Sequence, residues 1–315
     1  MNPRVISASR RTDIPAFYTP WFLNRLRAGF CFYPNPRFPQ QFHRVSLLPP
    51  DVLGLVFWTR HAAPLLPHLD ELDRAGFPYY FQYTVTGYPR TIERHTPPTD
   101  TAVQTFAELS RRVGAARVIW RYDPLLLCRE VTPAWQHDNF RRLADALAPF
   151  TQRVVVSVVD PYVRTQRRLG RTADGVQYAL EAYTDLISLI VAEAQARNLC
   201  VHACAESALS IAGITPSRCV DAELLYALRG ATPPARVRLH RQREGCLCHA
   251  SVDIGVNDSC GFGCRYCYAT NHPEQALATI RRHDPAWNCL TQDVVLDPRG
   301  EGDKAAATMN RPADG

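Results

Sequence analysis

Six short apolar segments, most of them followed by a helical pattern, leave this 315-residue sequence few possible folds. The segments are rich in β-branched and aromatic residues and are apolar throughout, which is typical of strands covered on both faces in a parallel sheet. They lie at residues 5–13, 52–60, 79–88, 117–124, 153–162 and 199–206. Because parallel strands that alternate with helices need right-handed crossovers, the pattern predicts a (β/α) barrel or an open doubly wound sheet.

Capping signals predict the helices between these segments. The helix over 99–114 has Thr99 or Asp100 as a candidate N-cap, and Gly114 ends it. Further helices are predicted from Thr132-Pro133 onward, over about 176–197 and over about 221–229.

Polar residues at the ends of the predicted strands favour the barrel, whose active site is built where the carboxyl ends of the strands meet. These residues are Arg10, Arg11, Asp13, Thr59, Arg60, Gln82, Thr84, Thr86, Arg121, Asp123, Asp160, His202 and Glu206. The competing interpretation of each is that strand ends are simply where a chain reaches water. We therefore expect an α/β barrel or partial barrel of about six to seven parallel strands.

The pattern changes after residue 206, and we divide the chain accordingly. Residues 1–210 are expected to form the barrel-like domain, and residues 211–290 a cysteine-rich segment that completes the barrel through one more short strand, SVDIG at 251–255. Residues 291–315 are polar and small and are expected to be a disordered tail.

Cysteine usage points to metal binding. No run of about 18 apolar residues occurs, and the first residues are charged where a signal peptide would be apolar, so we expect a cytoplasmic protein that makes no use of a membrane. In that compartment thiols stay reduced, and clustered cysteines are more often metal ligands than disulfides. Eight of the eleven cysteines lie between residues 200 and 267.

The net charge of +6 suits an anionic partner such as nucleic acid or a phosphorylated metabolite. No basic run or RNA-binding fingerprint accompanies it. The charge therefore leaves a nucleic-acid substrate and a small-molecule substrate both open.

The most specific motif is Cys260-Gly-Phe-Gly-Cys264-Arg-Tyr-Cys267, with the spacing C-x3-C-x2-C. Three thiolates on one tight loop can bind three irons of a [4Fe–4S] cluster and leave the fourth iron open. Gly261 and Gly263 suit such a loop because it needs unusual backbone angles.

This spacing, with Tyr266 before the third cysteine, resembles the signature of the radical S-adenosylmethionine enzymes. The resemblance implies that S-adenosylmethionine binds the open iron, that an electron from the cluster cleaves it to a 5′-deoxyadenosyl radical, and that a reducing electron donor is a partner. Tyr266 is then a cofactor-binding candidate.

Three other interpretations of the cysteines stay open. Cys246 or Cys248 together with the later cysteines could bind zinc, or could close a ferredoxin-like electron-transfer cluster, and the thiols could also carry no metal. The remaining cysteines suggest a second site, either an iron–sulfur cluster or zinc, whose ligands are Cys204, Cys219, Cys246 and Cys248.

Across residues 3 to 272 the segments SASRRTDIPAFY, VFWTR, WRYDP, CAE and SVDIG followed by C-x3-C-x2-CYA resemble an uncharacterised bacterial family, domain-of-unknown-function family 1848. Its noted feature is a C-terminal cysteine cluster similar to the N-terminal one of the radical enzymes. A circular permutation reconciles the two positions, and it predicts that SVDIG lies beside the strand at 5–9.

The strand-end residues supply candidate roles on such a fold. Arginines are suited to carboxylate or phosphate groups, and carboxylates to ribose hydroxyls or an amino group. We assign cofactor binding to Arg10, Arg11, Asp13, Arg60 and Asp160, and catalysis to Arg121, Asp123 and Glu206. Structural ion pairs, such as one between Arg121 and Asp123, are the competing interpretation.

The first hypothesis for function is a radical S-adenosylmethionine-type enzyme acting on an unidentified substrate. The second is a non-catalytic zinc or iron–sulfur protein that binds metal or transfers electrons. The third is a protein of nucleic-acid repair or modification.

Overall fold

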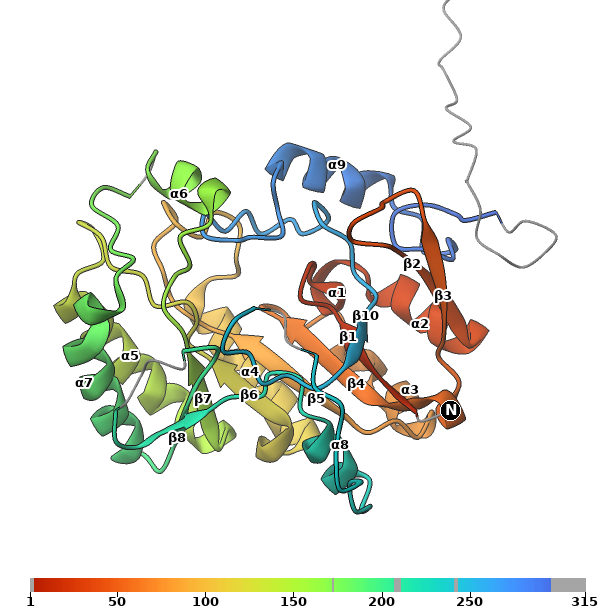
Figure 1. Ribbon diagram of the computed structural model, residues 1–315, viewed down its shortest axis with the longest axis horizontal. Helices are drawn as coiled ribbons and strands as arrows, with labels where there is room; N and C mark the ends of the chain where they lie inside the picture. The colour runs from red at the N-terminus through yellow and green to blue at the C-terminus, as the bar shows by residue number, and fades with distance from the viewer. Residues whose placement is uncertain (1–2, 172, 207–210, 241–242, 296–315) are drawn as a thin grey trace, which may run out of the picture.

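Eight strands form one sheet in which each neighbouring pair runs parallel, within residues 3–171, 173–206, 211–240 and 243–295 that the computed structural model describes. They are β1 (Arg4–Ala8), β4 (Val52–Thr59), β5 (Tyr79–Thr84), β6 (Val118–Arg121), β7 (Arg153–Val156), β8 (Cys200–Ala203), β9 (Ile214–Pro216) and β10 (Ser251–Asp253). Their order across the sheet is β10-β1-β4-β5-β6-β7-β8-β9 (Figure 1). The predicted parallel α/β fold is confirmed.

The number of strands is larger than predicted, and the sheet has two edges. All seven predicted strands form, and β9 is an eighth; its three residues, Ile214 to Pro216, are too few to show a strand pattern in the sequence. Strands β10 and β9 are the two edges and do not pair with each other among the described residues. The structure thus shows a parallel sheet without a closed barrel.

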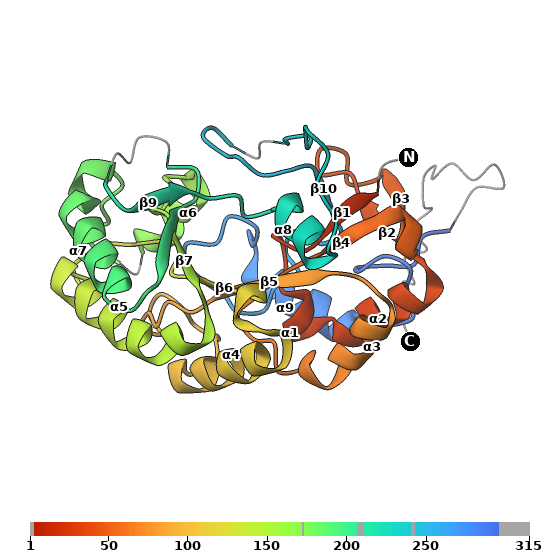
Figure 2. The same cartoon turned by 90° about the horizontal axis from the view of Figure 1, so that it is seen from below.

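Helices cover the sheet unequally. They are α1 (Ile14–Phe17), α2 (Thr19–Ala28), α3 (Leu69–Arg74), α4 (Thr99–Val113), α5 (Pro133–Leu147), α6 (Val163–Leu169), α7 (Thr184–Gln195), α8 (Ala222–Leu228) and α9 (Pro273–Arg282). Helices α4, α5 and α7 lie along one face, and α8 lies on the other (Figure 2). Because alternate residues of a strand point to opposite faces, Phe81 packs in the core under α4 and α5, whereas Tyr80 packs with Leu225 of α8.

The capping predictions are partly confirmed. The hydroxyl of Thr132 accepts the Trp135 N–H at 3.2 Å and caps α5, and Gly114, with φ of 94°, ends α4. The expected Thr99 or Asp100 cap of α4 is wrong, because Pro98 holds that position without a side-chain hydrogen bond.

The third predicted helix begins later than residue 176. The Gln177 N–H donates to the Leu127 carbonyl at 3.0 Å, which holds this part of the chain extended. Helix α7 therefore starts only at Thr184.

Strand β10 lies beside β1, as the permutation predicts. Val5 is in register with Ser251, and Ser7 with Asp253. This pairing places the cysteine loop that follows β10 at the carboxyl ends of the strands, next to the residues that follow β1.

A second, two-stranded sheet was not predicted. It consists of β2 (Phe30–Pro34) and β3 (Phe42–Ser46), which pair antiparallel at one side of the molecule (Figure 1). Phe32 packs there with Cys289 and Val294. Most of the predicted tail, 296–315, lies outside the described residues, whereas 291–295 are described and include the buried Val294. No described helix is long and apolar enough to cross a membrane.

Candidate functional site

The cysteine motif forms a loop that is attached to two neighbouring segments at the carboxyl ends of the strands. Its Phe262 carbonyl accepts the His95 N–H at 3.0 Å, and its Arg265 N–H donates to the Ile92 carbonyl at 2.9 Å. Both partners belong to the segment that follows β5. Within the loop, the Cys267 N–H donates to the Cys264 carbonyl at 3.2 Å. The loop is therefore fixed by backbone hydrogen bonds.

The two glycines of the motif are there for different reasons. Gly263 has φ of +65°, a conformation that residues with side chains rarely adopt. Gly261 has no such angle, but a Cβ atom on it would lie 2.9 Å from Ile280 of α9 and 3.2 Å from the Phe17 ring. A side chain at Gly261 would therefore require Ile280 or Phe17 to shift.

The three thiols of the motif share one environment. Cys264 is buried and Cys260 and Cys267 are partly buried, and the three sulfurs are near enough to influence one another's ionisation. Burial raises the pKa of Cys260 above its usual value and that of Cys264 to about 12, while the Arg60 guanidinium opposes the rise at Cys264. No group of three or more His, Cys, Asp or Glu side chains in the described residues is placed to hold a metal ion.

A buried polar network supports the loop from the side of β4 and β5. Arg60 follows β4, and its Nη1 lies 2.8 Å from Oε1 of Glu93, which is 3% exposed. Oε1 of Glu93 also accepts the hydroxyls of Thr86, at 2.5 Å, and of Tyr266. The guanidinium of Arg60 also bonds to the Tyr266 hydroxyl. Tyr266 is thereby anchored by an ion pair next to the cysteines.

Asp13 connects the end of β1 to the same network. Its two carboxylate oxygens accept the N–H groups of Ala16, at 3.0 Å, and Arg60, at 2.6 Å. Burial raises the pKa of Asp13 to about 7, although these N–H groups favour the ionised form. Asp13 thus caps α1 and positions the backbone of Arg60, close to Cys260.

Arg10 and Arg11 both face Asp253 of β10. Each Nε lies 3.5 Å from an oxygen of that carboxylate, which also accepts the hydroxyls of Ser7, at 3.0 Å, and Ser9. The carboxylate of Asp253 therefore ties β1 to β10, and its single negative charge balances only one of the two arginines that were predicted to bind a cofactor.

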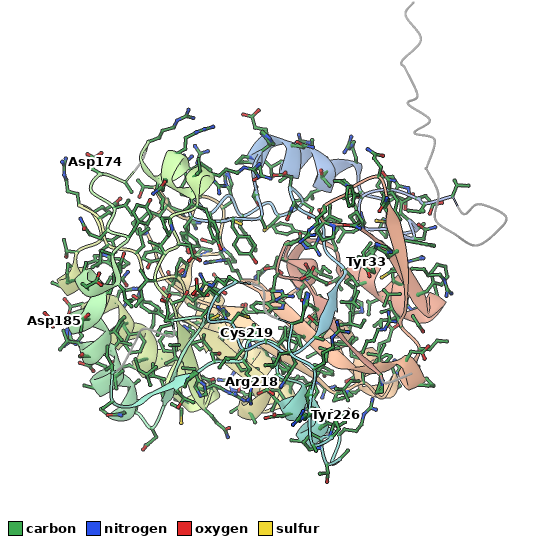
Figure 3. All side chains as sticks on the ribbon, in the orientation of Figure 1. Tyr33, Asp174, Asp185, Arg218, Cys219 and Tyr226 are labelled. Atoms are coloured by element: carbon green, nitrogen blue, oxygen red, sulfur yellow. The ribbon has the colours of Figure 1, made fainter. Side chains whose placement is uncertain are left out.

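The second set of cysteines lies together on the face of the sheet that carries α8. The sulfurs of Cys204 and Cys219 lie 3.1 Å apart, and Cys248 makes hydrogen bonds with both Cys219 and Cys246 (Cys219 is labelled in Figure 3). Nη1 of Arg121 donates to the Cys219 sulfur at 3.0 Å. Hydrogen bonds with Cys204 and Cys248, together with Arg121, lower the pKa of Cys219 well below its usual value. The four predicted residues are thus neighbours.

The remaining predicted residues lie near this quartet. Asp123 forms an ion pair with Arg121 and also accepts the Ser157 hydroxyl. Oε1 of Glu206 accepts the Val158 N–H at 2.9 Å, and burial raises the pKa of Glu206. Asp160 pairs with Arg243. Each of these carboxylates therefore has a partner within the protein.

Arg10 lies near Cys219 and Cys248 of the second set and near Tyr268, which follows Cys267 of the motif. The guanidinium groups of Arg10 and Arg121 lie 5.9 and 5.2 Å from the ring centre of Trp58. The Tyr268 hydroxyl donates to the Arg10 carbonyl at 3.1 Å, immediately after Cys267. Both groups of predicted residues are thus brought to one end of the sheet, with Arg10 between them.

A cavity of about 260 Å³ borders the network of Arg60, Thr86 and Glu93. Its opposite wall is the start of α4, from Pro98 to Ala102.

Three functional candidates were missed from the sequence: Glu93, Arg243 and Asp253. Asp253 had a usable signal, since it lies in the strand directly before the cysteine loop. Glu93 and Arg243 lie in connections whose course no local pattern predicts.

The comparisons with known proteins add a family and little else. Residues 5–269 match the family described as a domain of unknown function (DUF1848). No curated protein matches the chain. Among solved structures, a putative short-chain alcohol dehydrogenase from Sinorhizobium meliloti 1021 is 10% identical, with a TM-score of 0.23, over 67% of this chain and 75% of that one.

Proposed function

The chain belongs to the family of domain of unknown function DUF1848, and within it we propose an iron–sulfur enzyme of the radical S-adenosylmethionine type, in which Cys260, Cys264 and Cys267 hold a [4Fe–4S] cluster. When bound, the cluster would supply the electron that cleaves S-adenosylmethionine to a 5′-deoxyadenosyl radical. The substrate is a small molecule or a nucleic acid, and a reducing electron donor is a partner.

The observation that carries the proposal is the placement of three neighbouring thiols on one rigid loop. The loop follows β10, is bonded to the segment after β5, and has a glycine, Gly261, where it packs closely against Ile280 of α9. A cluster with three cysteine ligands binds each thiolate through a different iron, so its ligands need not converge on one point as those of a single ion must. Three cysteine ligands also leave one iron of the cluster open, as the proposed chemistry requires.

The position of Cys246 and Cys248 weighs against the alternatives that need them beside the motif. Both cysteines interact with Cys219 or with each other. A zinc site or a closed electron-transfer cluster built from Cys260, Cys264 and Cys267 would then lack its fourth thiolate. We propose instead that Cys204, Cys219, Cys246 and Cys248 form a second site, for an iron–sulfur cluster or zinc.

This chain's own residues have positioning roles around the loop. The ion pair of Arg60 with Glu93 holds the Tyr266 hydroxyl, and Asp13 fixes the backbone of Arg60. Arg10 and Arg11, with their charge shared by Asp253, are placed to orient a cofactor carboxylate. Arg121, Asp123 and Glu206 are proposed to face the substrate, and Asp160 the cofactor, in a partial barrel that stays open between β9 and β10.

The test is metal analysis of protein purified without oxygen. We expect about four irons and four sulfides per cluster, a spectral change on adding S-adenosylmethionine, and release of 5′-deoxyadenosine after reduction. Cys264→Ala should lose the responsive cluster, whereas Cys200→Ala, at an exposed cysteine, should keep it. A colourless zinc protein, or a cluster that ignores S-adenosylmethionine, would refute the proposal.

A further inference from the structure

Six arginines from three separate segments surround the cysteine loop and are called the arginine patch. They are Arg94, Arg164, Arg167, Arg168, Arg171 and Arg265. Arg168 of α6 donates to the carbonyls of Cys267 and, at 2.5 Å, of Thr270. Arg164 bonds to Asn271, and Arg94 packs within 4 Å of the Cβ position of Gly263. Helix α6 and the cysteine loop therefore share one surface, at the top of Figure 1.

Five arginines of the patch have no neighbouring carboxylate among the residues that the structure describes. Arg94, Arg164, Arg167, Arg171 and Arg265 have none within 4 Å in this part of the chain. Other surface arginines have one, for example Arg27 with Glu71 at 2.7 Å and Arg218 with Glu223 at 2.9 Å. An anionic ligand would relieve this repulsion.

Arginines from all three segments of the patch lie close together. Arg265 of the cysteine loop is near Arg94, which follows β5, and near Arg168 and Arg171 of the segment that begins with α6. Their like charges therefore repel one another.

Two exposed tyrosines lie beside the patch. Tyr162, immediately before α6, is 45% exposed, and Tyr268, immediately after Cys267, is 54% exposed. Their ring centres are 6.3 Å apart, with an angle of 51° between the ring planes. Exposed aromatic rings next to a positive surface provide the stacking surface that unpaired bases need.

We propose that the arginine patch, with Tyr162 and Tyr268, binds single-stranded nucleic acid, whose phosphates contact the arginines and whose bases stack on the tyrosines. An arginine fork matches phosphate oxygens, and the paired rings give a reason to prefer nucleic acid to an acidic protein, which needs only the charge. The patch surrounds the loop assigned to the cluster, so the further claim that the bound strand is the substrate rests on the proposed function. The claim that the patch binds a strand does not depend on the proposed function.

The experiment measures the binding of fluorescently labelled 20-nucleotide single-stranded RNA and DNA by anisotropy at several salt concentrations. The triple variant Arg94→Glu, Arg167→Glu, Arg171→Glu should bind at least about tenfold more weakly. The slope of the logarithm of its binding constant against the logarithm of the salt concentration should be shallower by about 2, since three phosphate contacts are lost. A matched triple variant at three other exposed arginines, Arg37→Glu, Arg74→Glu, Arg111→Glu, should weaken binding much less.

Stacking is tested separately. Tyr162→Ala and Tyr268→Ala should each weaken binding by about 5- to 150-fold without changing the salt dependence, as expected for the loss of one stacked base. Circular dichroism of every variant checks that it is folded.

Three results would overturn the inference. The patch and control variants could bind the oligonucleotides equally, or neither oligonucleotide could bind at low salt. In the third, the patch would bind an acidic protein, for which a flavodoxin is the probe, and no oligonucleotide. Iron is measured on the same samples. An iron-free protein with patch-dependent binding would refute only the proposed function. An iron–sulfur protein that binds no oligonucleotide would refute only this inference.

Discussion

Replacing Glu93 by glutamine tests whether a buried ion pair holds the cysteine loop. Glu93 is 3% exposed, and its Oε1 lies 2.8 Å from Nη1 of Arg60, which is itself 13% exposed. Glutamine keeps the shape of the side chain but leaves the Arg60 charge buried without a counter-ion. Breaking a buried pair from one side costs about 3–5 kcal/mol, so we expect the free energy of unfolding of Glu93→Gln to fall by that amount.

Urea unfolding followed by tryptophan fluorescence measures the loss, with iron content as a second readout. The control is Glu71→Gln, because the pair of Glu71 with Arg27 is solvent-exposed and its removal should cost about 0–1 kcal/mol. The double variant Arg60→Met, Glu93→Leu should recover much of the stability, since an apolar pair leaves no buried charge. A loss in Glu93→Gln no larger than in Glu71→Gln would refute the reasoning.

Three further predictions concern pH, packing and capping. The pKa of Asp13 is about 7 in the folded protein and about 3.9 in an unfolded chain. The folded state therefore holds the extra proton, and the free energy of unfolding should fall as pH rises from about 4 to 7. Urea unfolding across this range should show a smaller fall in Asp13→Asn, and an equal dependence on pH in the two proteins would contradict the assignment. Gly261→Ala places a methyl group against Ile280, so it should lower the free energy of unfolding by about 1–3 kcal/mol and reduce the iron content. An unchanged thermal unfolding temperature and iron content would contradict this prediction. Thr132→Ala removes the cap of α5 and should cost about 0.5–2 kcal/mol in urea unfolding, without changing the iron content.

The sequence was most informative about the sheet, because six of the strands lie in apolar runs and most of these runs precede a helical pattern. The seven predicted strands form, and β10 pairs with β1 as the permutation implied by the resemblance to the radical enzymes predicts. Local patterns were less informative where tertiary contacts decide the conformation. The backbone hydrogen bond from Gln177 to Leu127 moves the start of α7 further along the chain. Pro98 takes the N-cap position of α4 that Thr99 or Asp100 was expected to hold.

The residue types of the site could be predicted, but their partners could not. The strand-end arginines and carboxylates do gather at one end of the sheet, yet most of them are bonded to one another. Arg10 and Arg11 pair with Asp253, more than 240 residues later in the chain. Glu93, which pairs with Arg60, lies in a connection without a motif. Such pairings depend on the path of the loops, which a single sequence does not specify.

The neighbouring positions of β1 and β10 have a consequence for biosynthesis. Ser7 is translated 246 residues before Asp253, its hydrogen-bond partner on β10, an interval of roughly 12–50 s at about 5–20 residues per second. During that time the nascent chain presents an unpaired strand edge at β1, next to the apolar Val5 and Ile6, which invites aggregation. The strand that supports the cysteine loop, β10, is made late, so metal loading would have to follow the emergence of this segment from the ribosome. Chaperone protection of the early chain should therefore matter more for this protein than for one whose first strand pairs only with strands made soon after it.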